Sequence, residues 1–105
     1  MDIEIQVAVQ FIVSFVNGKF SKSCFENFEN QLRKLLIVKF HGHWYPEKPS
    51  KGNAYRCISI ENSLDAVITK AAKHAEIDVQ VLSSLLPKRL DLWIDPAEVS
   101  YRIGE

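Results

Sequence analysis

Apolar and polar residues alternate strictly over residues 90–95, which read Leu-Asp-Leu-Trp-Ile-Asp. This period-two pattern predicts a half-buried β-strand with its leucines and isoleucine facing the core. The opposite face places Trp93 between Asp91 and Asp95, on the side that should meet water. Because tryptophan is enriched among interface hot spots, Trp93 is a candidate anchor for a partner. The alternative is that another segment of the same chain covers it.

A helical period dominates the first forty residues. Residues 2–18 are apolar on nearly all sides, which predicts a central, buried helix ending at Gly18. The apolar spacing of residues 25–36 predicts a second helix, which Ser23 and Glu26 would open as a capping box. Only a short turn separates the two segments, so we expect an antiparallel helix pair.

Short strands and helices alternate in the rest of the chain. Residues 54–60 predict a central strand that is at least partly covered on both faces, and residues 64–76 and 79–85 predict two short helices. A last strand is expected over residues 98–103. Its inward-facing residues would be Val99, Tyr101 and Ile103. The pattern predicts an α+β fold, a single compact domain whose N-terminal antiparallel helix pair packs on a small sheet with further short helices.

Length, charge and cysteine content narrow the class of protein. We expect residues 1–105 to form one domain, cut from a longer protein. Thirteen basic and thirteen acidic residues give zero net charge, which argues against a general binder of nucleic acid or anionic membranes. Cys24 and Cys57 lack metal-site spacing and indicate a reducing, intracellular location, cytoplasmic or also nuclear. No apolar run reaches the length of a membrane span.

Candidate catalytic chemistry is sparse. His41 and His43 could share one face of a strand, but no third ligand with zinc-site spacing accompanies them. Asp91 and Asp95 would lie about 13 Å apart along a strand, which is too far for paired carboxylate chemistry. Cys57 lies within a predicted strand, where a small core residue is the simpler interpretation than a nucleophile. We therefore expect no enzymatic activity, no cofactor and no bound metal.

Three stretches together resemble the BTG/Tob family of antiproliferative proteins. Residues 42–49 read Gly-His-Trp-Tyr-Pro-Glu-Lys-Pro, and residues 51–58 continue as Lys-Gly-Asn-Ala-Tyr-Arg-Cys-Ile, similar to the family's box A region. Residues 86–105 include Leu-Trp-Ile-Asp-Pro-Ala-Glu-Val-Ser-Tyr-Arg-Ile-Gly-Glu and resemble box B. Residues 3–8 resemble the family's opening helix. The resemblance covers essentially the whole chain.

The resemblance implies an adaptor domain without enzymatic activity. Family members bind the exonuclease subunit of the cytoplasmic mRNA deadenylase complex and so promote poly(A) shortening, translational repression and exit from proliferation. RNA would be engaged only through partners, and no membrane contact is implied. The residues of this chain that match the family's binding surface are Tyr55, Asp65, Trp93 and Asp95.

The chain departs from the family pattern beside two of these residues. Ala66 follows Asp65 where the family usually has proline, and Ala97 follows Pro96 where the family prefers an aromatic residue. This altered rim, together with zero net charge and high apolar content, motivates a second hypothesis. In it the domain acts by self-assembly, as a dimer or polymer that scaffolds an RNA–protein complex.

Overall fold

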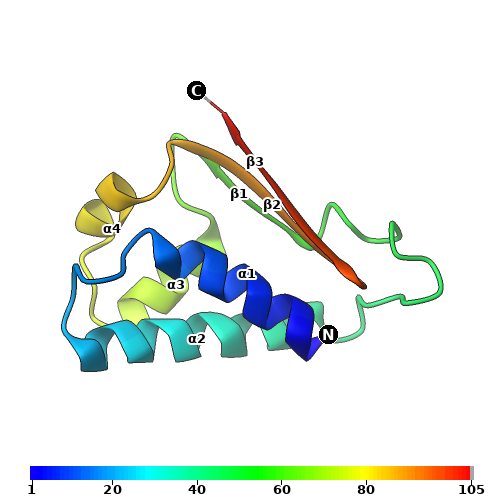
Figure 1. The fold of residues 1–105 in the computed structure, drawn as a ribbon, viewed down its shortest axis with the longest axis horizontal. Helices are drawn as coiled ribbons and strands as arrows, with labels where there is room; N and C mark the ends of the chain where they lie inside the picture. Colours follow the sequence, from blue (N-terminus) through cyan, green and yellow to red (C-terminus); the bar gives the residue numbers. More distant parts are fainter. Residues whose placement is uncertain (105) are drawn as a thin grey trace.

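The computed structural model describes residues 1–104, and Figure 1 shows its helices gathered on one side of a small sheet. Helix α1, Asp2–Ser14, lies antiparallel to α2, Lys22–Phe40, and also packs on the sheet. Helix α3, Ala66–His74, packs on α2, and the short α4, Val79–Leu85, packs on α3. These elements confirm the predicted α+β fold and its helix pair.

The sheet has three antiparallel strands in the order β1-β2-β3. Strand β1 is Cys57–Glu61, the central β2 is Arg89–Asp95, and β3 is Glu98–Gly104. The side chains of β2 alternate between buried and half-buried, as the sequence pattern predicted. Since the described helices all lie on one side of the sheet (Figure 1), the other face of β2 has no helix over it.

The core fills the space between the helices and the inner face of the sheet. Apolar burial of this kind is the main stabilising contribution to a domain of this size. Its fully buried members on the sheet and on α2 are Ile58, Leu92, Ile94, Phe28, Leu32, Leu36 and Phe40. No helix within residues 1–104 is long and apolar enough to cross a bilayer.

Helix α1 differs from the prediction of a central helix enclosed on all sides. It ends at Ser14 rather than at Gly18, and only one of its faces packs on α2 and the sheet. On the opposite face Ile3 is 79% exposed and Val7 is 50% exposed. The apolar residues all round α1 therefore reflect a helix at the surface that carries unpartnered apolar side chains.

The start of α2 also differs from the prediction. Ser21 has extended backbone angles, and its Oγ accepts a hydrogen bond from the Cys24 N–H at 3.2 Å, which makes it the N-cap. Ser23 already lies inside the helix, so the predicted capping box at Ser23 and Glu26 is wrong. In α3 and α4 the caps are Asp65 and Asp78, whose side chains accept hydrogen bonds from the N–H groups of Val67 and Gln80.

Two predictions about the strands are wrong because the strand order could not be read from the sequence. Strand β1 begins at Cys57 and lies at an edge of the sheet, so its Ser59 side chain is exposed. Strand β3 forms the other edge. Its Tyr101 and Ile103, expected inside, are 57% and 49% exposed. The Tyr101 ring is covered on one side by Phe11 of α1, with the ring centroids 4.4 Å apart.

Candidate functional site

Trp93 lies half-buried on the face of β2 that points away from the helices. Its neighbours across the strands are two small residues, Cys57 on β1 and Ser100 on β3. The guanidinium of Arg102 lies 5.9 Å from the centre of the indole ring. Small neighbours leave part of a large apolar ring in contact with solvent. No helix covers Trp93, but Arg102 of β3 lies over part of its ring, so the alternative of cover by another segment of the chain holds only in part.

Tyr55 precedes β1 and is 45% exposed. Its ring stacks on His43 with the ring centres 4.3 Å apart, and Lys39 Nζ lies 5.1 Å from the ring centre. Tyr55 also lines a hollow of about 350 Å³ between α2 and α3, whose lining includes Asp65. Two of the four site residues predicted from the sequence therefore share one surface depression.

The carboxylate of Asp65 is held by the chain's own backbone. Its Oδ1 accepts a hydrogen bond from the Val67 N–H at 3.0 Å, which caps α3, and its Oδ2 accepts one from the Ser59 N–H at 3.0 Å, on β1. The two bonds join the start of a helix to an edge strand. Asp65 is therefore fixed in place although alanine, and not proline, follows it.

Asp95 is held by a buried arginine that the sequence analysis did not select. Arg56 is fully buried, and its five N–H groups all have an acceptor within the chain. Asp95 Oδ1 accepts from Arg56 Nη2 at 2.9 Å. The other acceptors, at 2.7–2.9 Å, are the carbonyl oxygens of Ile94, His43, Lys51 and Pro49. We call Arg56, Asp95 and these four carbonyls the Arg56 anchor.

The Arg56 anchor fixes the irregular segment between α2 and β1. Gly52 is required there because its φ is +76° and because a Cβ would lie 3.0 Å from Arg56 Nη1. The sequence contained a sign that Arg56 is buried. In the predicted strand over residues 54–60, Arg56 lies on the same face as the apolar Ile58 and Ile60. A charged residue on an apolar face needs partners inside the protein.

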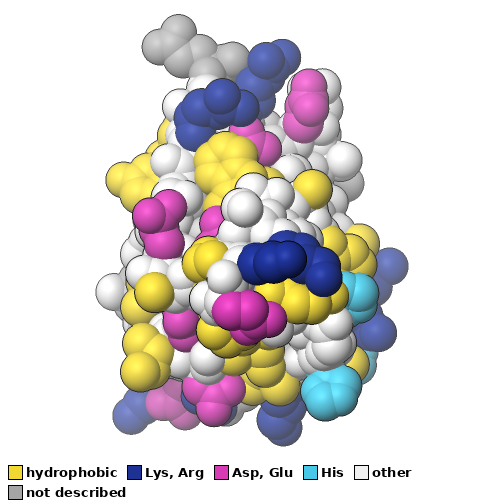
Figure 2. All heavy atoms as spheres, turned by 90° about the vertical axis from the view of Figure 1, so that its right-hand side faces the viewer, with side chains coloured by type: hydrophobic (Ala, Val, Ile, Leu, Met, Phe, Trp, Pro, Cys, Tyr) yellow, Lys and Arg dark blue, Asp and Glu magenta, His cyan; other side chains and the backbone are white. Residues whose placement is uncertain are grey.

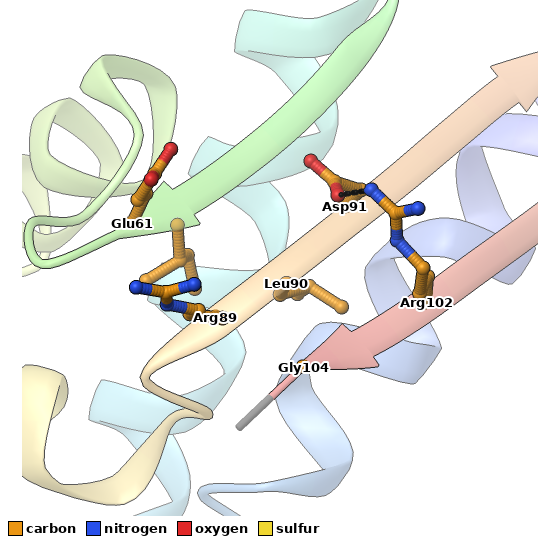
Figure 3. Close-up of a pocket in the computed structure, with 7 residues that line it drawn as sticks. Glu61, Arg89, Leu90, Asp91, Arg102 and Gly104 are labelled. Atoms are coloured by element: carbon orange, nitrogen blue, oxygen red, sulfur yellow. Dashed lines mark hydrogen bonds and ion pairs between the residues drawn. The ribbon is translucent and has the colours of Figure 1, made fainter.

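A polar row crosses the outer face of the sheet beyond Trp93. Asp91 accepts hydrogen bonds from Ser59 Oγ at 3.2 Å and from Arg102 Nη2 at 2.9 Å. Figure 3 shows this ion pair at the edge of a hollow on the sheet. The hollow has a volume of about 270 Å³, and Glu61 and Arg89 also line it. Exposed pairs of this kind contribute little to stability. Their charges of opposite sign give the row no strong field of its own.

Catalytic and metal-binding chemistry find little support among the described residues. Burial raises the pKa of the Cys57 thiol, and nearby Asp91 raises it further, while a hydrogen bond from Ser59 works in the opposite direction. A thiol held in its protonated form is a poor nucleophile. Within residues 1–104, no three His, Cys, Asp or Glu side chains are grouped as metal ligands would be.

The structure ties all four predicted site residues to the segment 55–59. Tyr55 belongs to it, Trp93 pairs with Cys57, Asp95 bonds to Arg56, and Asp65 bonds to Ser59. Figure 2 views the end of the molecule that carries the segment before β1 and the turn between β2 and β3. There, apolar side chains are interleaved with acidic and basic ones. The arrangement can present aromatic surface to a partner, with charges of both signs around it.

Comparisons with known proteins agree with this architecture. Human Tob1 is 47% identical over 105 residues, and human BTG1 is 46% identical over 104 residues. The chain spans 30% of the length of Tob1 and 61% of the length of BTG1. In three dimensions it is similar to the C. elegans FOG-3 BTG/Tob domain, with a TM-score of 0.89 at 22% identity, covering the whole chain and 76% of that domain's chain. The sequence model of the BTG family matches residues 1–105, and the chain belongs to this family.

Proposed function

We propose that this domain is a non-enzymatic adaptor that binds the exonuclease subunit of the cytoplasmic mRNA deadenylase complex. Through this contact it promotes poly(A) shortening and translational repression, and so acts as an antiproliferative regulator in the cytoplasm and also the nucleus. The observation that carries the proposal is the partly exposed indole of Trp93 on the helix-free face of the sheet. Membership of the BTG family supports the choice of partner.

The two aromatic residues are the proposed source of binding energy. Covering the remaining surface of Trp93 removes apolar area from water, and its position in mid-strand makes it rigid before binding. Tyr55 contributes a ring that His43 holds in place. Asp65 and Asp95 use their internal bonds to set the backbone around the aromatic pair. Each carboxylate keeps lone pairs that a basic or amide group of the partner can use.

Affinity purification of the full-length protein tests the proposal, with wild type compared to Trp93→Ala and partners identified by mass spectrometry. We expect the deadenylase subunits to be lost from the Trp93→Ala sample. The matched control is Val81→Ala, because Val81 is 47% exposed on α4, away from the proposed face. Equal recovery of the deadenylase with both variants would contradict the proposal, provided that circular dichroism shows both to be folded.

We propose self-assembly as a second candidate function, because apolar side chains at the β3 edge lack cover. Tyr101 and Ile103 are 57% and 49% exposed, and the Tyr101 ring stacks on Phe11 of α1. Sedimentation of the full-length protein over a range of concentrations tests this function. A monomer at the highest concentration would exclude it, and a dimer or polymer that dissociates on Tyr101→Ser substitution would support it.

A further inference from the structure

The hollow between α2 and α3 has a lining that suits one kind of partner segment. Its apolar surface comes from five residues, Leu35, Val38, Tyr55, Ala66 and Val67. The lining also contains two basic residues, Lys39 and Lys70. We call this depression, about 350 Å³ in volume, the α2–α3 hollow.

The apolar part of the α2–α3 hollow is open to solvent. Leu35, Val38 and Lys39 lie at helical spacings of three and four residues, so they share one face of α2. Val38 is 74% exposed and Tyr55 is 45% exposed, which is unusual for two apolar side chains on one depression. Neighbouring exposed apolar residues of this kind often belong to an interaction site.

The charge around the α2–α3 hollow favours an acidic occupant. Among residues 1–104, neither Lys39 nor Lys70 has a carboxylate oxygen within 4 Å, since the ion pairs that form involve other residues. Lys39 instead places its ammonium over the Tyr55 ring. The single acid in the lining, Asp65, has both oxygens bonded to backbone N–H groups. The two ammonium groups are therefore available to anions from outside the chain.

We propose that the α2–α3 hollow receives an acidic segment of the deadenylase subunit, with one apolar side chain against Val38 and Tyr55 and carboxylates beside Lys39 and Lys70. The inference rests on the proposed function and extends the interface from the sheet onto the two helices. Tyr55 belongs to both parts, because it precedes β1 and lines the hollow. Trp93 pairs with Cys57, which lies two residues after Tyr55, and so connects the sheet to the hollow.

Charge reversal with a matched control tests the inference. The exonuclease subunit is titrated by calorimetry into the full-length protein at low and at physiological ionic strength, using wild type and the double variant Lys39→Glu/Lys70→Glu. We expect affinity to fall about tenfold or more at low salt, and the loss to shrink as salt screens the charges. The control is Lys34→Glu/Lys73→Glu, which changes charge equally on the same two helices, at exposed positions outside the hollow.

The outcomes separate the inference from the function on which it rests. If Trp93→Ala weakens binding but the Lys39/Lys70 variant matches the Lys34/Lys73 control, the adaptor function stands and the acidic-segment inference is wrong. If wild type does not bind the subunit at all, both are wrong. A shift of wild type, but not of Lys39→Glu/Lys70→Glu, toward a dimer in sedimentation would assign the hollow to a second copy and overturn the inference. Urea denaturation of every variant measures its free energy of unfolding and so checks that the affinities are compared between folded proteins.

Discussion

The Arg56 anchor and the surface around Trp93 both involve strand β2, yet they use their side chains in opposite ways. In the anchor, every N–H of a fully buried guanidinium donates to an acceptor inside the chain, and Asp95 is one of those acceptors. Two residues earlier, Trp93 has small neighbours and keeps part of its ring in solvent. A set of four candidate residues therefore contains two kinds: aromatic residues with free surface, and carboxylates with internal bonds.

This difference changes how substitutions at the site should be interpreted. Loss of binding on replacing Asp65 or Asp95 can follow from a displaced backbone, since each carboxylate joins elements that are distant in the sequence. Loss of binding on replacing Trp93 reports more directly on the partner contact. Each variant consequently needs a measurement of unfolding beside its measurement of affinity.

The largest expected effect is that of Arg56→Met, which breaks the anchor while keeping a long side chain. Four carbonyls and the Asp95 carboxylate lose their donors. We expect the free energy of unfolding to fall by about 3–5 kcal/mol in urea denaturation. Arg33→Met is the control, because Arg33 bonds only to the nearby Asn30 on its own helix. A loss below about 1 kcal/mol for Arg56→Met would mean that the anchor does not hold this region.

Asp65→Ala tests whether the carboxylate of Asp65 stabilises the fold. It removes the cap of α3 and the bond to β1, so we expect a loss of about 1–2 kcal/mol in the free energy of unfolding. Asp65→Ser should recover part of that loss, because serine can still cap Val67. If Asp65→Ala left unfolding unchanged and removed only binding, the assignment of Asp65 to the structural group would be wrong.

The turn between β2 and β3 provides a smaller test beside the anchor. Ala97 follows Pro96 with a φ of +65°, a left-handed conformation that costs a non-glycine residue roughly 1 kcal/mol. Ala97→Gly should therefore raise the free energy of unfolding by about 0.5 kcal/mol, after the added flexibility of the unfolded chain is counted. Ala66→Gly, at the first position of α3, should lower it instead. Thermal unfolding of the two variants would contradict this reasoning if they shifted in the same direction.

The smallest effect concerns Glu4, whose carboxylate holds the same turn from α1. Its pKa lies below the usual 4.5, chiefly because Glu4 Oε2 accepts a hydrogen bond from the Ala97 N–H at 2.9 Å. A lowered pKa in the folded state adds stability that is present above the usual value and is lost as pH falls through the folded value. Glu4→Gln should be less stable than wild type at neutral pH, and the gap in the free energy of unfolding should narrow as pH falls below 4.5. A gap independent of pH would show that the ionised form has no special role.

Local patterns predicted most elements of the fold, and distant contacts explain what they missed. The alternation around Trp93 depends on neighbouring residues only, and the strand that it predicts is confirmed. Tyr101 was predicted to be buried, and this prediction is wrong because β3 lies at the edge of the sheet. No local pattern in the sequence shows which strand is at the edge. The acceptors of Arg56 lie 5–39 residues away along the chain, so its role required the assembled fold.

Physical patterns in the sequence predicted only part of the candidate site. Trp93 followed from the alternation alone, because a large ring between two acids on a solvent-facing side is unusual. Tyr55, Asp65 and Asp95 came from the family resemblance, and no local pattern indicated that both carboxylates would bond within the chain. The lysines of the α2–α3 hollow were also missed, since α2 and α3 are separated by the whole segment that leads into β1.

Calorimetric titration of the purified exonuclease subunit into the Trp93→Ala domain tests the central claim most directly, which is that solvent-facing aromatic surface drives docking. The account predicts a loss of at least about 2 kcal/mol of binding free energy. It also predicts a smaller change in the free energy of unfolding, because the ring is only half-buried. Wild-type affinity for the subunit in a folded Trp93→Ala domain would contradict the account.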